Sequence, residues 1–342
     1  LIGLVGSEMC IRDSVNSYPV AAFPASQGQE QLWFLNELNP NSQLAYTMAV
    51  RVSIKGKLDT LQLQRAVNRV VAAQEIFRTS FRYINGELSQ LISPSATQPI
   101  HKVDCINDSH ALQRLINMEV RRGWSLTTAP IYRLLLIRAG EENHELIICT
   151  HHIVCDGISL QLLLKQIVTA YQTPQDSPIV DDEQRLQFVD YAAWSKQHAH
   201  LGMDYWQAQL ADAPTVLDIT SLPSRAEQQT FAGARIPLSF LKDEWQALRH
   251  TFAHQGISTA SVFLAAYGVV LHRLAEQADI LIGVPTSNRL RSELAQMIGY
   301  VSNIGVFRSR YVDCQSVTQY LQGVQQTLSN LIEHGETPLL DV

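Results

Sequence analysis

Two adjacent histidines, His151 and His152, are followed after three residues by Asp156 and Gly157. With an ordinary pKa of about 6.5, histidine is suited to act as a general base or to position a nucleophile through a hydrogen bond. The pair lies where an apolar run predicted as a buried strand ends and an apolar helix begins. Because side chains alternate along a strand, the two rings should point to opposite sides if the strand continues through both.

The same residues also fit purely structural roles. Asp156 is well placed to cap the helix that follows, and Gly157 to supply a backbone angle that other residues resist. Two histidines and an aspartate also suggest a metal site. However, adjacent strand residues point in opposite directions and no third histidine follows at helical spacing, so we expect no metal.

The elements that must position this pair are interleaved strands and helices. Alternating or continuous apolar runs predict strands at residues 46–54, 131–138 and 145–152. Apolar residues at three- and four-residue spacing predict helices at residues 58–71, 111–121 and 158–171, the first capped by Asp59 or Thr60. This alternation predicts an α/β fold, in the sense of an α+β layered domain.

The second half of the chain repeats this organisation loosely. Residues 172–185 are rich in Pro, Asp and Gln and predict a linker. The elements expected beyond it are helices at 188–199, around Tyr205–Trp206, at 261–274 and near 317–334, and a strand at 279–284. The segment Gly256–Ala260 is expected to be a helix N-cap rather than a nucleophile elbow.

We therefore divide the chain into three parts. Residues 1–14 look like translated adapter sequence and are treated as a non-native leader. Residues 15–180 form an N-terminal lobe that carries the histidine pair, and residues 181–342 form a C-terminal lobe. The last residues come just after a helix without a closing strand, so we expect the second lobe to be truncated.

Composition excludes several classes of function. With 26 basic and 32 acidic side chains the net charge is −6, the wrong sign for a surface that holds nucleic acid. No apolar run reaches the 18 or so residues that a membrane span needs, so no membrane partner is expected. The five cysteines include no CxxC pair, which favours a reducing, cytoplasmic setting.

At residues 151–157 the pattern His-His-x-x-x-Asp-Gly resembles the signature of the condensation domains of nonribosomal peptide synthetases, which belong to the chloramphenicol acetyltransferase-like superfamily. Further segments resemble other motifs of that family, in order and at suitable intervals. These segments are Ser26–Leu35, Gln74–Phe81, Phe188–Trp194, Ile298–Asn303 and His334–Leu339. The resemblance extends from about residue 17 to the end of the chain.

The resemblance implies a fold of two chloramphenicol acetyltransferase-like lobes with a channel between them. It implies that an upstream peptidyl carrier domain presents an acyl or peptidyl thioester, and that a downstream carrier presents an aminoacyl amine that attacks it. The carriers would hold their substrates on 4'-phosphopantetheine, with no cofactor bound directly by this chain. An adenylation domain would be adjacent.

The resemblance also assigns roles to single residues. His152 is implied to be catalytic, while His151 and Gly157 support the site. Asp156 is implied to be structural, held by an ion pair to Arg289 of the second lobe. The remaining motif or channel positions are Ser26, Gln29, Trp33, Arg78, Trp194 and Asn303. Trp33 and Arg78 are expected to be structural, and Asn303 either to line the channel or simply to pack.

Three alternatives remain open. The closest is a stand-alone acyltransferase that makes esters or amides from a carrier or coenzyme A thioester. An epimerization domain is less favoured, because Gly157-Ile158-Ser159 follows the aspartate where that family usually has Trp. A non-catalytic recruitment domain would typically have lost the histidine pair. Departures from the family's pattern at Gln74, Ser302 and Gly335 leave room for a divergent subclass.

Overall fold

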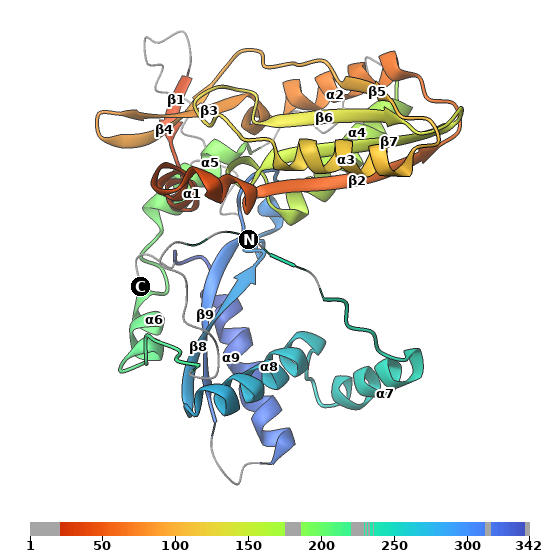
Figure 1. Cartoon of the computed structure of the whole chain (residues 1–342). Helices are drawn as coiled ribbons and strands as arrows, with labels where there is room; N and C mark the ends of the chain where they lie inside the picture. Colours follow the sequence, from red (N-terminus) through yellow and green to blue (C-terminus); the bar gives the residue numbers. More distant parts are fainter. Residues whose placement is uncertain are drawn as a thin grey trace. The chain divides into compact units, whose positions relative to one another are not determined.

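The computed structural model describes residues 21–174, 186–219, 229, 231, 233–234, 236–311 and 316–338. Residue contacts divide the chain into two compact units, which Figure 1 traces in sequence colours. Unit 1 comprises Leu1–Gln197 and Arg289–Val301, and unit 2 comprises His198–Asn288 and Ser302–Val342. The histidine pair therefore belongs to unit 1, together with the short segment that begins at Arg289.

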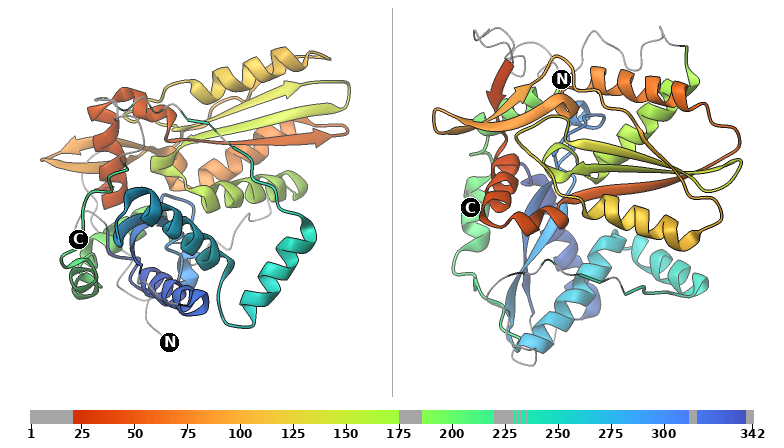
Figure 2. Two further views of the ribbon diagram at one scale, coloured as in Figure 1. Left: turned by 60° about the horizontal axis from the view of Figure 1, so that its bottom comes forward. Right: turned by 45° about the horizontal axis from the view of Figure 1, so that its top comes forward.

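Unit 1 is built on a four-stranded sheet in the order β2-β7-β6-β5. The central strand β7 runs antiparallel to both β2 and β6, while β5 runs parallel to β6. Helix α3 covers one face of this sheet, and helices α2 and α4 cover the other (Figure 2). These elements are β2 (Thr47–Lys55), β5 (His101–Asp104), β6 (Tyr132–Arg138), β7 (Asn143–His151), α2 (Thr60–Ala73), α3 (Ser109–Arg121) and α4 (Gly157–Gln172).

The periodicity of the sequence explains why these helices form where they do. In α2 the buried residues are the apolar ones at three- and four-residue spacing, namely Leu63, Ala66, Val67, Val70 and Val71. The side chain of Asp59 accepts hydrogen bonds from the main-chain N–H groups of two first-turn residues, as expected of an N-cap. Strand β6 is buried along nearly its whole length because helices cover both faces of the sheet.

A second, three-stranded sheet of unit 1 has the order β1-β4-β3, and all its neighbouring strands are antiparallel. Helix α1 follows β1 directly, and α5 contributes several aromatic side chains to the same core. The sequence analysis did not predict these strands. The elements are β1 (Ala21–Pro24), β3 (Thr79–Ile84), β4 (Glu87–Ile92), α1 (Gln27–Leu38), α5 (Phe188–Gln197) and the short 3-10 helices η1 (Pro40–Leu44) and η2 (Glu75–Arg78).

Unit 2 has a two-stranded antiparallel sheet, β8–β9, against which α8 and α9 pack. Its core includes Trp206 of α6, and Ser258 caps α8 as the sequence predicted. None of the described helices is both long and apolar enough to cross a membrane. The elements are α6 (Met203–Leu210), α7 (Lys242–Ala253), α8 (Thr259–Ala275), β8 (Asp279–Thr286), β9 (Asn303–Arg310) and α9 (Val317–Glu333).

The division into units differs in detail from the lobes drawn on the sequence. The predicted leader at residues 1–14, the predicted boundary at residue 180 and most of the predicted linker lie outside the described residues. Helix α5 and Arg289, both placed in the second lobe by the sequence analysis, belong to unit 1. For α5 the reason is burial, since Phe188, Tyr191 and Trp194 are part of the core of unit 1.

Candidate active site

The strand that carries the histidine pair ends between the two residues. Strand β7 stops at His151, and His152 opens a short 3-10 helix, η3 (His152–Val154). The main-chain N–H of His152 donates to the carbonyl oxygen of Tyr46 at 2.8 Å, which fixes the point where the chain turns. The alternation expected of a continuous strand therefore does not extend to His152. Its ring direction is set by the turn instead.

His151 is completely enclosed. Its side chain has no exposed surface, and its Nδ1 accepts a hydrogen bond from the main-chain N–H of Ile153 at 3.1 Å. The neutral ring therefore carries its proton on Nε2, which has no partner among the described residues. Aromatic rings of Tyr46 and Trp124 lie next to the imidazole. Burial, with a smaller contribution from His152, lowers the pKa of His151 to about 3, so this ring is neutral at physiological pH.

His152 keeps part of its side chain exposed. Burial lowers the pKa of its imidazole from the ordinary 6.5, while the main-chain carbonyls of His152 and Cys155 and the charge of Asp156 oppose that shift. Nδ1 makes no hydrogen bond of good geometry with a described residue. A neutral imidazole of this kind can accept a proton or a hydrogen bond from a substrate.

Asp156 combines the two structural roles that the sequence suggested. Its Oδ1 caps α4 by accepting from the main-chain N–H of Ser159 at 2.8 Å. The same oxygen accepts from Nη2 of Arg289 at 3.1 Å, in an ion pair whose side chains are only 3% and 5% exposed. Its Oδ2 accepts from the main-chain N–H of Val301 at 3.2 Å. The buried carboxylate therefore has a hydrogen-bond donor from α4, from Arg289 and from the main chain at residue 301.

Ser159 and Arg289 extend this network to the segment that precedes β9. The hydroxyl of Ser159 donates to the carbonyl of Gly299 at 2.8 Å and accepts from the N–H of the same residue at 3.0 Å. Arg289 Nη2 also donates to Ser159 Oγ at 2.9 Å and to the carbonyl of Met297 at 3.0 Å. The turn after β7 and residues 297–301 are thereby fixed to one another.

Residues of the first predicted motif reach the turn from another direction. Ser26 and Gln29 form a reciprocal capping box at the start of α1. The Gln29 amide nitrogen also donates to Gln90 Oε1 and to the main-chain carbonyl of Ile153, each at 3.2 Å. Ser26 and Gln29 are both buried, at 4% and 0% exposure. Their role in this structure is to hold η3 against α1 and β4.

Three further motif residues have structural environments. Trp33 is buried and packs against Phe81 and Tyr83. Arg78 donates to the main-chain carbonyl of Ser93 and, at a longer distance of 3.5 Å, to that of Ala72. Trp194 is buried in α5, with the guanidinium of Arg291 4.6 Å above its ring.

Asn303 opens β9 in unit 2. Both hydrogens of its side-chain amide are used on the carbonyl oxygens of Gly335 and Thr337, each at 2.9 Å, and its Oδ1 accepts from the N–H of Ile304. The last residue of the motif segment Ile298–Asn303 therefore braces the main chain of the segment that begins at His334. An amide committed in this way has few groups left for a substrate, so the contacts favour packing over the channel-lining role.

Gly157 does not need the unusual backbone angle that the sequence analysis allowed for. Its φ lies outside the left-handed region, and a Cβ added there would meet no atom within 4 Å. The residue is simply the first of α4. Open space beside Gly157 distinguishes it from Gly299, where a Cβ would lie 1.9 Å from the ring of Phe188.

Sequence reasoning missed several residues that shape the site. Tyr300 lies inside the motif segment Ile298–Asn303, and its ring lies against that of His152 with centroids 4.8 Å apart. On the His151 side, Arg133 stacks 3.6 Å above Trp124 and its Nε pairs with Glu119 Oε1 at 2.7 Å. An arginine within an apolar strand was the only sequence signal for this second buried ion pair.

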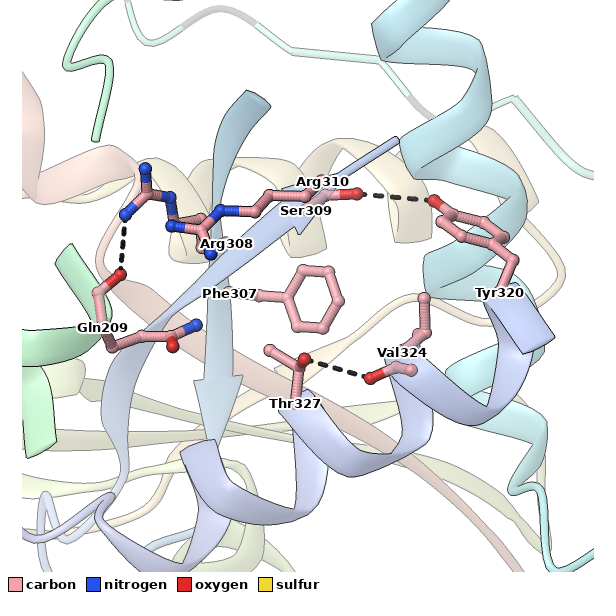
Figure 3. Close-up of a pocket in the computed structure, with 9 residues that line it drawn as sticks. Gln209, Phe307, Arg308, Ser309, Arg310, Tyr320, Val324 and Thr327 are labelled. Carbon is pink, nitrogen blue, oxygen red and sulfur yellow. Dashed lines mark hydrogen bonds between the residues drawn. The ribbon is translucent and has the colours of Figure 1, made fainter. Parts of the chain in front are cut away.

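A cavity in unit 2 contains none of the residues assigned to chemistry. It has a volume of about 240 Å³ and lies between β9 and α9 (Figure 3). Most of its polar side chains have partners: Arg308 donates to the carbonyl of Gln209 and pairs with Asp279, Ser309 bonds Tyr320, and Thr327 donates to the carbonyl of Gly323. Within the described part of the chain, no three His, Cys, Asp or Glu side chains are placed to hold a metal ion.

Comparison with known proteins agrees with this description. The sequence profile of the condensation domain matches residues 21–342. Tyrocidine synthase 2 of Brevibacillus parabrevis is 30% identical over 325 residues, which are 94% of this chain and 9% of that protein. This chain therefore spans a small part of the curated relative it matches.

Solved structures show the same fold. The first condensation domain of the calcium-dependent antibiotic synthetase, in complex with a substrate analogue, has a TM-score of 0.79 at 20% identity, covering 94% of this chain and 77% of that one. The X-domain from teicoplanin biosynthesis, in complex with OxyB, has a TM-score of 0.80 at 20% identity, covering 95% and 74%. The predicted chloramphenicol acetyltransferase-like fold is confirmed, and with the profile match over nearly its whole length this chain belongs to the condensation domain family of nonribosomal peptide synthetases.

Proposed function

We propose that this domain forms an amide bond between an acyl or peptidyl thioester and the amine of an aminoacyl thioester, with His152 as its catalytic residue. The observation that carries this proposal is the contrast between the two histidines. His151 is sealed among aromatic rings, whereas His152 is partly exposed and neutral at physiological pH. Of the pair, only His152 combines an accessible ring with a proton-accepting form.

The reaction needs little base strength. An α-amino group has a pKa of about 7.7 to 8.0, so part of it is already neutral at pH 7. Its nitrogen attacks the thioester carbon, a C–N bond forms and the C–S bond breaks. The sulfur leaves as a thiolate, which takes up the proton that the nitrogen loses and becomes a thiol. The His152 imidazole accepts a hydrogen bond or the proton from the amine during this attack, and orients it.

We propose that the two thioesters are presented on the 4'-phosphopantetheine arms of upstream and downstream carrier domains, with an adenylation domain adjacent. The arm holds each substrate as a reactive thioester. The support is that the matching relatives are large synthetases of which this chain spans a small part. A reducing, cytoplasmic setting suits the free, buried thiols of Cys105, Cys149 and Cys155.

The test is an amide-transfer assay with purified carriers. The chain is incubated with an acyl-loaded donor carrier and an aminoacyl-loaded acceptor carrier, and both carriers are followed by intact-protein mass spectrometry. We expect the donor mass to move to the acceptor, and His152→Ala to slow this by 100-fold or more, an effect on the scale of about 10² to 10⁴ known for general base residues. The matched control is His101→Ala, an exposed histidine in β5, which should retain full transfer.

Other outcomes would redirect the assignment. Acylation of a free amine or alcohol, with no transfer to the acceptor carrier, would identify a stand-alone acyltransferase. Near-native transfer by His152→Ala would overturn the catalytic role of this residue. Because the X-domain of the same fold was solved in complex with OxyB, stable binding of another protein with no transfer would favour a recruitment domain.

A further inference from the structure

The inference concerns Tyr300 and rests on the catalytic role proposed for His152. Tyr300 lies between Gly299 and Val301, and the main chain of both neighbours is fixed to the turn after β7. Ser159 Oγ bonds both main-chain polar groups of Gly299, and Asp156 Oδ2 accepts from the N–H of Val301. The side chain of Tyr300 is therefore attached to main chain that is fixed on both sides.

This ring fills the space between α1 and the imidazole. Its centroid lies 4.8 Å from that of His152, and the two planes are inclined by 68°, an edge-to-face contact. On its other side the ring approaches Gly28 so closely that a Cβ there would lie 2.9 Å from Cε1 of Tyr300. The glycine in the first turn of α1 is what leaves room for the ring.

The groups around His152 give this contact a chemical meaning. The titratable or charged groups near the imidazole are His151 and Cys155 on its own segment, Asp156 with its partner Arg289, Tyr46 before β2, and Tyr300. Burial raises the pKa of Tyr300 to about 12, so its hydroxyl stays neutral. The ring of Tyr300 therefore places an uncharged, largely apolar group against the imidazole.

We propose that Tyr300 is a positioning residue whose ring holds the imidazole of His152 in one orientation and excludes water from one side of it. The aromatic ring, rather than the hydroxyl, performs this role. Removing the ring frees the imidazole to rotate and admits water, which brings its titration closer to that of an ordinary histidine. Replacing Tyr300 with Phe keeps the ring and should change little.

The first measurement is the titration of His152 by NMR in the full chain labelled at histidine, with the signal assigned by its loss in His152→Gln. We expect the pKa of His152 to rise toward 6.5 in Tyr300→Ala and to stay at its wild-type value in Tyr300→Phe. The matched control is Tyr83→Ala, a half-exposed tyrosine that packs on Trp33, which should leave the titration unchanged.

The second measurement is the carrier assay. A misplaced catalytic group costs about 100-fold in rate, so Tyr300→Ala should lower kcat by about that factor with KM nearly constant, and Tyr300→Phe should restore it. An unchanged His152 titration in folded Tyr300→Ala would overturn the proposal. So would a Tyr300→Phe variant as impaired as Tyr300→Ala, because the hydroxyl would then be the active part.

A further variant covers the case in which Tyr300→Ala does not fold. Gly28→Ala leaves Tyr300 in place but directs a methyl group at its ring, and we expect the His152 signals and kcat to shift while circular dichroism stays native. If both are unchanged, the proposal is wrong. The NMR titration needs no activity. If the wild-type chain forms no amide but the pKa of His152 still rises in Tyr300→Ala, the proposed function is refuted and the positioning role stands.

Discussion

Each histidine of the pair lies beside an aromatic ring that a buried ion pair supports, but the two arrangements differ. Behind His151, the pair Glu119–Arg133 supports Trp124. Behind His152, the pair Asp156–Arg289 fixes the main chain around Tyr300. The first arrangement closes completely over its histidine, whereas the second leaves its histidine partly exposed. Adjacent residues of one type thus become a core side chain and a candidate catalyst through their neighbours.

The largest expected effect comes from breaking the two ion pairs separately. Asp156→Ala leaves Arg289 buried without its carboxylate and removes the cap of α4, so we expect a loss of about 3–5 kcal/mol in unfolding free energy. Glu119→Ala should cost less, about 1–3 kcal/mol, because three main-chain carbonyls still accept from Arg133. Urea unfolding at pH 7 measures both.

The NMR titration of His152 in the same two variants gives a second measurement. Only Asp156→Ala should move the NMR titration of His152, since Glu119 lies behind the other histidine. Two results would contradict this separation of the ion pairs. One is an equal loss of unfolding free energy in both variants, and the other is a changed pKa of His152 in Glu119→Ala.

Two glycines test how tightly the segment beside His152 is packed. Gly299→Ala directs a Cβ to within 1.9 Å of the Phe188 ring, and we expect it to lower the unfolding free energy by about 3 kcal/mol through overpacking. Gly157→Ala meets no atom within 4 Å and should change stability by less than about 1 kcal/mol. Thermal unfolding of the two variants distinguishes the sites, and similar values would contradict this packing.

The enclosed histidine predicts a pH dependence of stability. The pKa of His151 is about 3 in the folded protein and about 6.5 in the unfolded chain, so the unfolded state binds one more proton between these values. Its contribution is therefore complete above pH 6.5 and falls by about 1.4 kcal/mol per pH unit below it.

Urea unfolding at pH 7, 6 and 5 measures this slope. His151→Phe should reduce this slope by the equivalent of about one proton, whatever the variant does to stability at pH 7. A smaller slope should remain, because the lowered pKa of His152 contributes separately. An unchanged slope would show that His151 can be protonated without unfolding.

The smallest effect is expected from an exposed ion pair in the same sheet. Arg138 and Asp104 pair at 2.8 Å, but their side chains are 46% and 66% exposed. Asp104→Ala should cost less than about 1 kcal/mol, and added salt should reduce the cost further. A cost comparable to that of Asp156→Ala would remove burial as the reason for the difference.

The sequence was most informative where one local pattern decides the outcome. The spacing of apolar residues predicted α2, with Asp59 or Thr60 as its cap, and the structure has Asp59. The apolar runs predicted β6 and β7 to within two residues at each end. Strands β1, β3 and β4 were not predicted, because short segments of mixed polarity carry no clear period. The hairpin signal Asn85-Gly86 between β3 and β4 was overlooked, whereas β1 pairs with β4 across a long stretch of sequence.

At the site, sequence reasoning identified the residues but not their environments. The ion pair between Asp156 and Arg289 was expected from the resemblance and is present in the structure. The end of β7 at His151, the ring contact of Tyr300 and the use of Asn303 as a brace all depend on contacts between distant segments. No spacing pattern along the chain encodes such contacts.

The hydrogen bonds that fix the turn after β7 also set the order in which this site can form. Gln29 and Ile153 are 124 residues apart in the sequence, and Ser159 and Gly299 are 140 residues apart. Contacts of such separation close large loops and form late, after local helices and hairpins. During synthesis on the ribosome, the turn around His152 can therefore reach its final geometry only once residue 301 has emerged from the exit tunnel. Until then the growing chain exposes a histidine that has not yet acquired its neighbours.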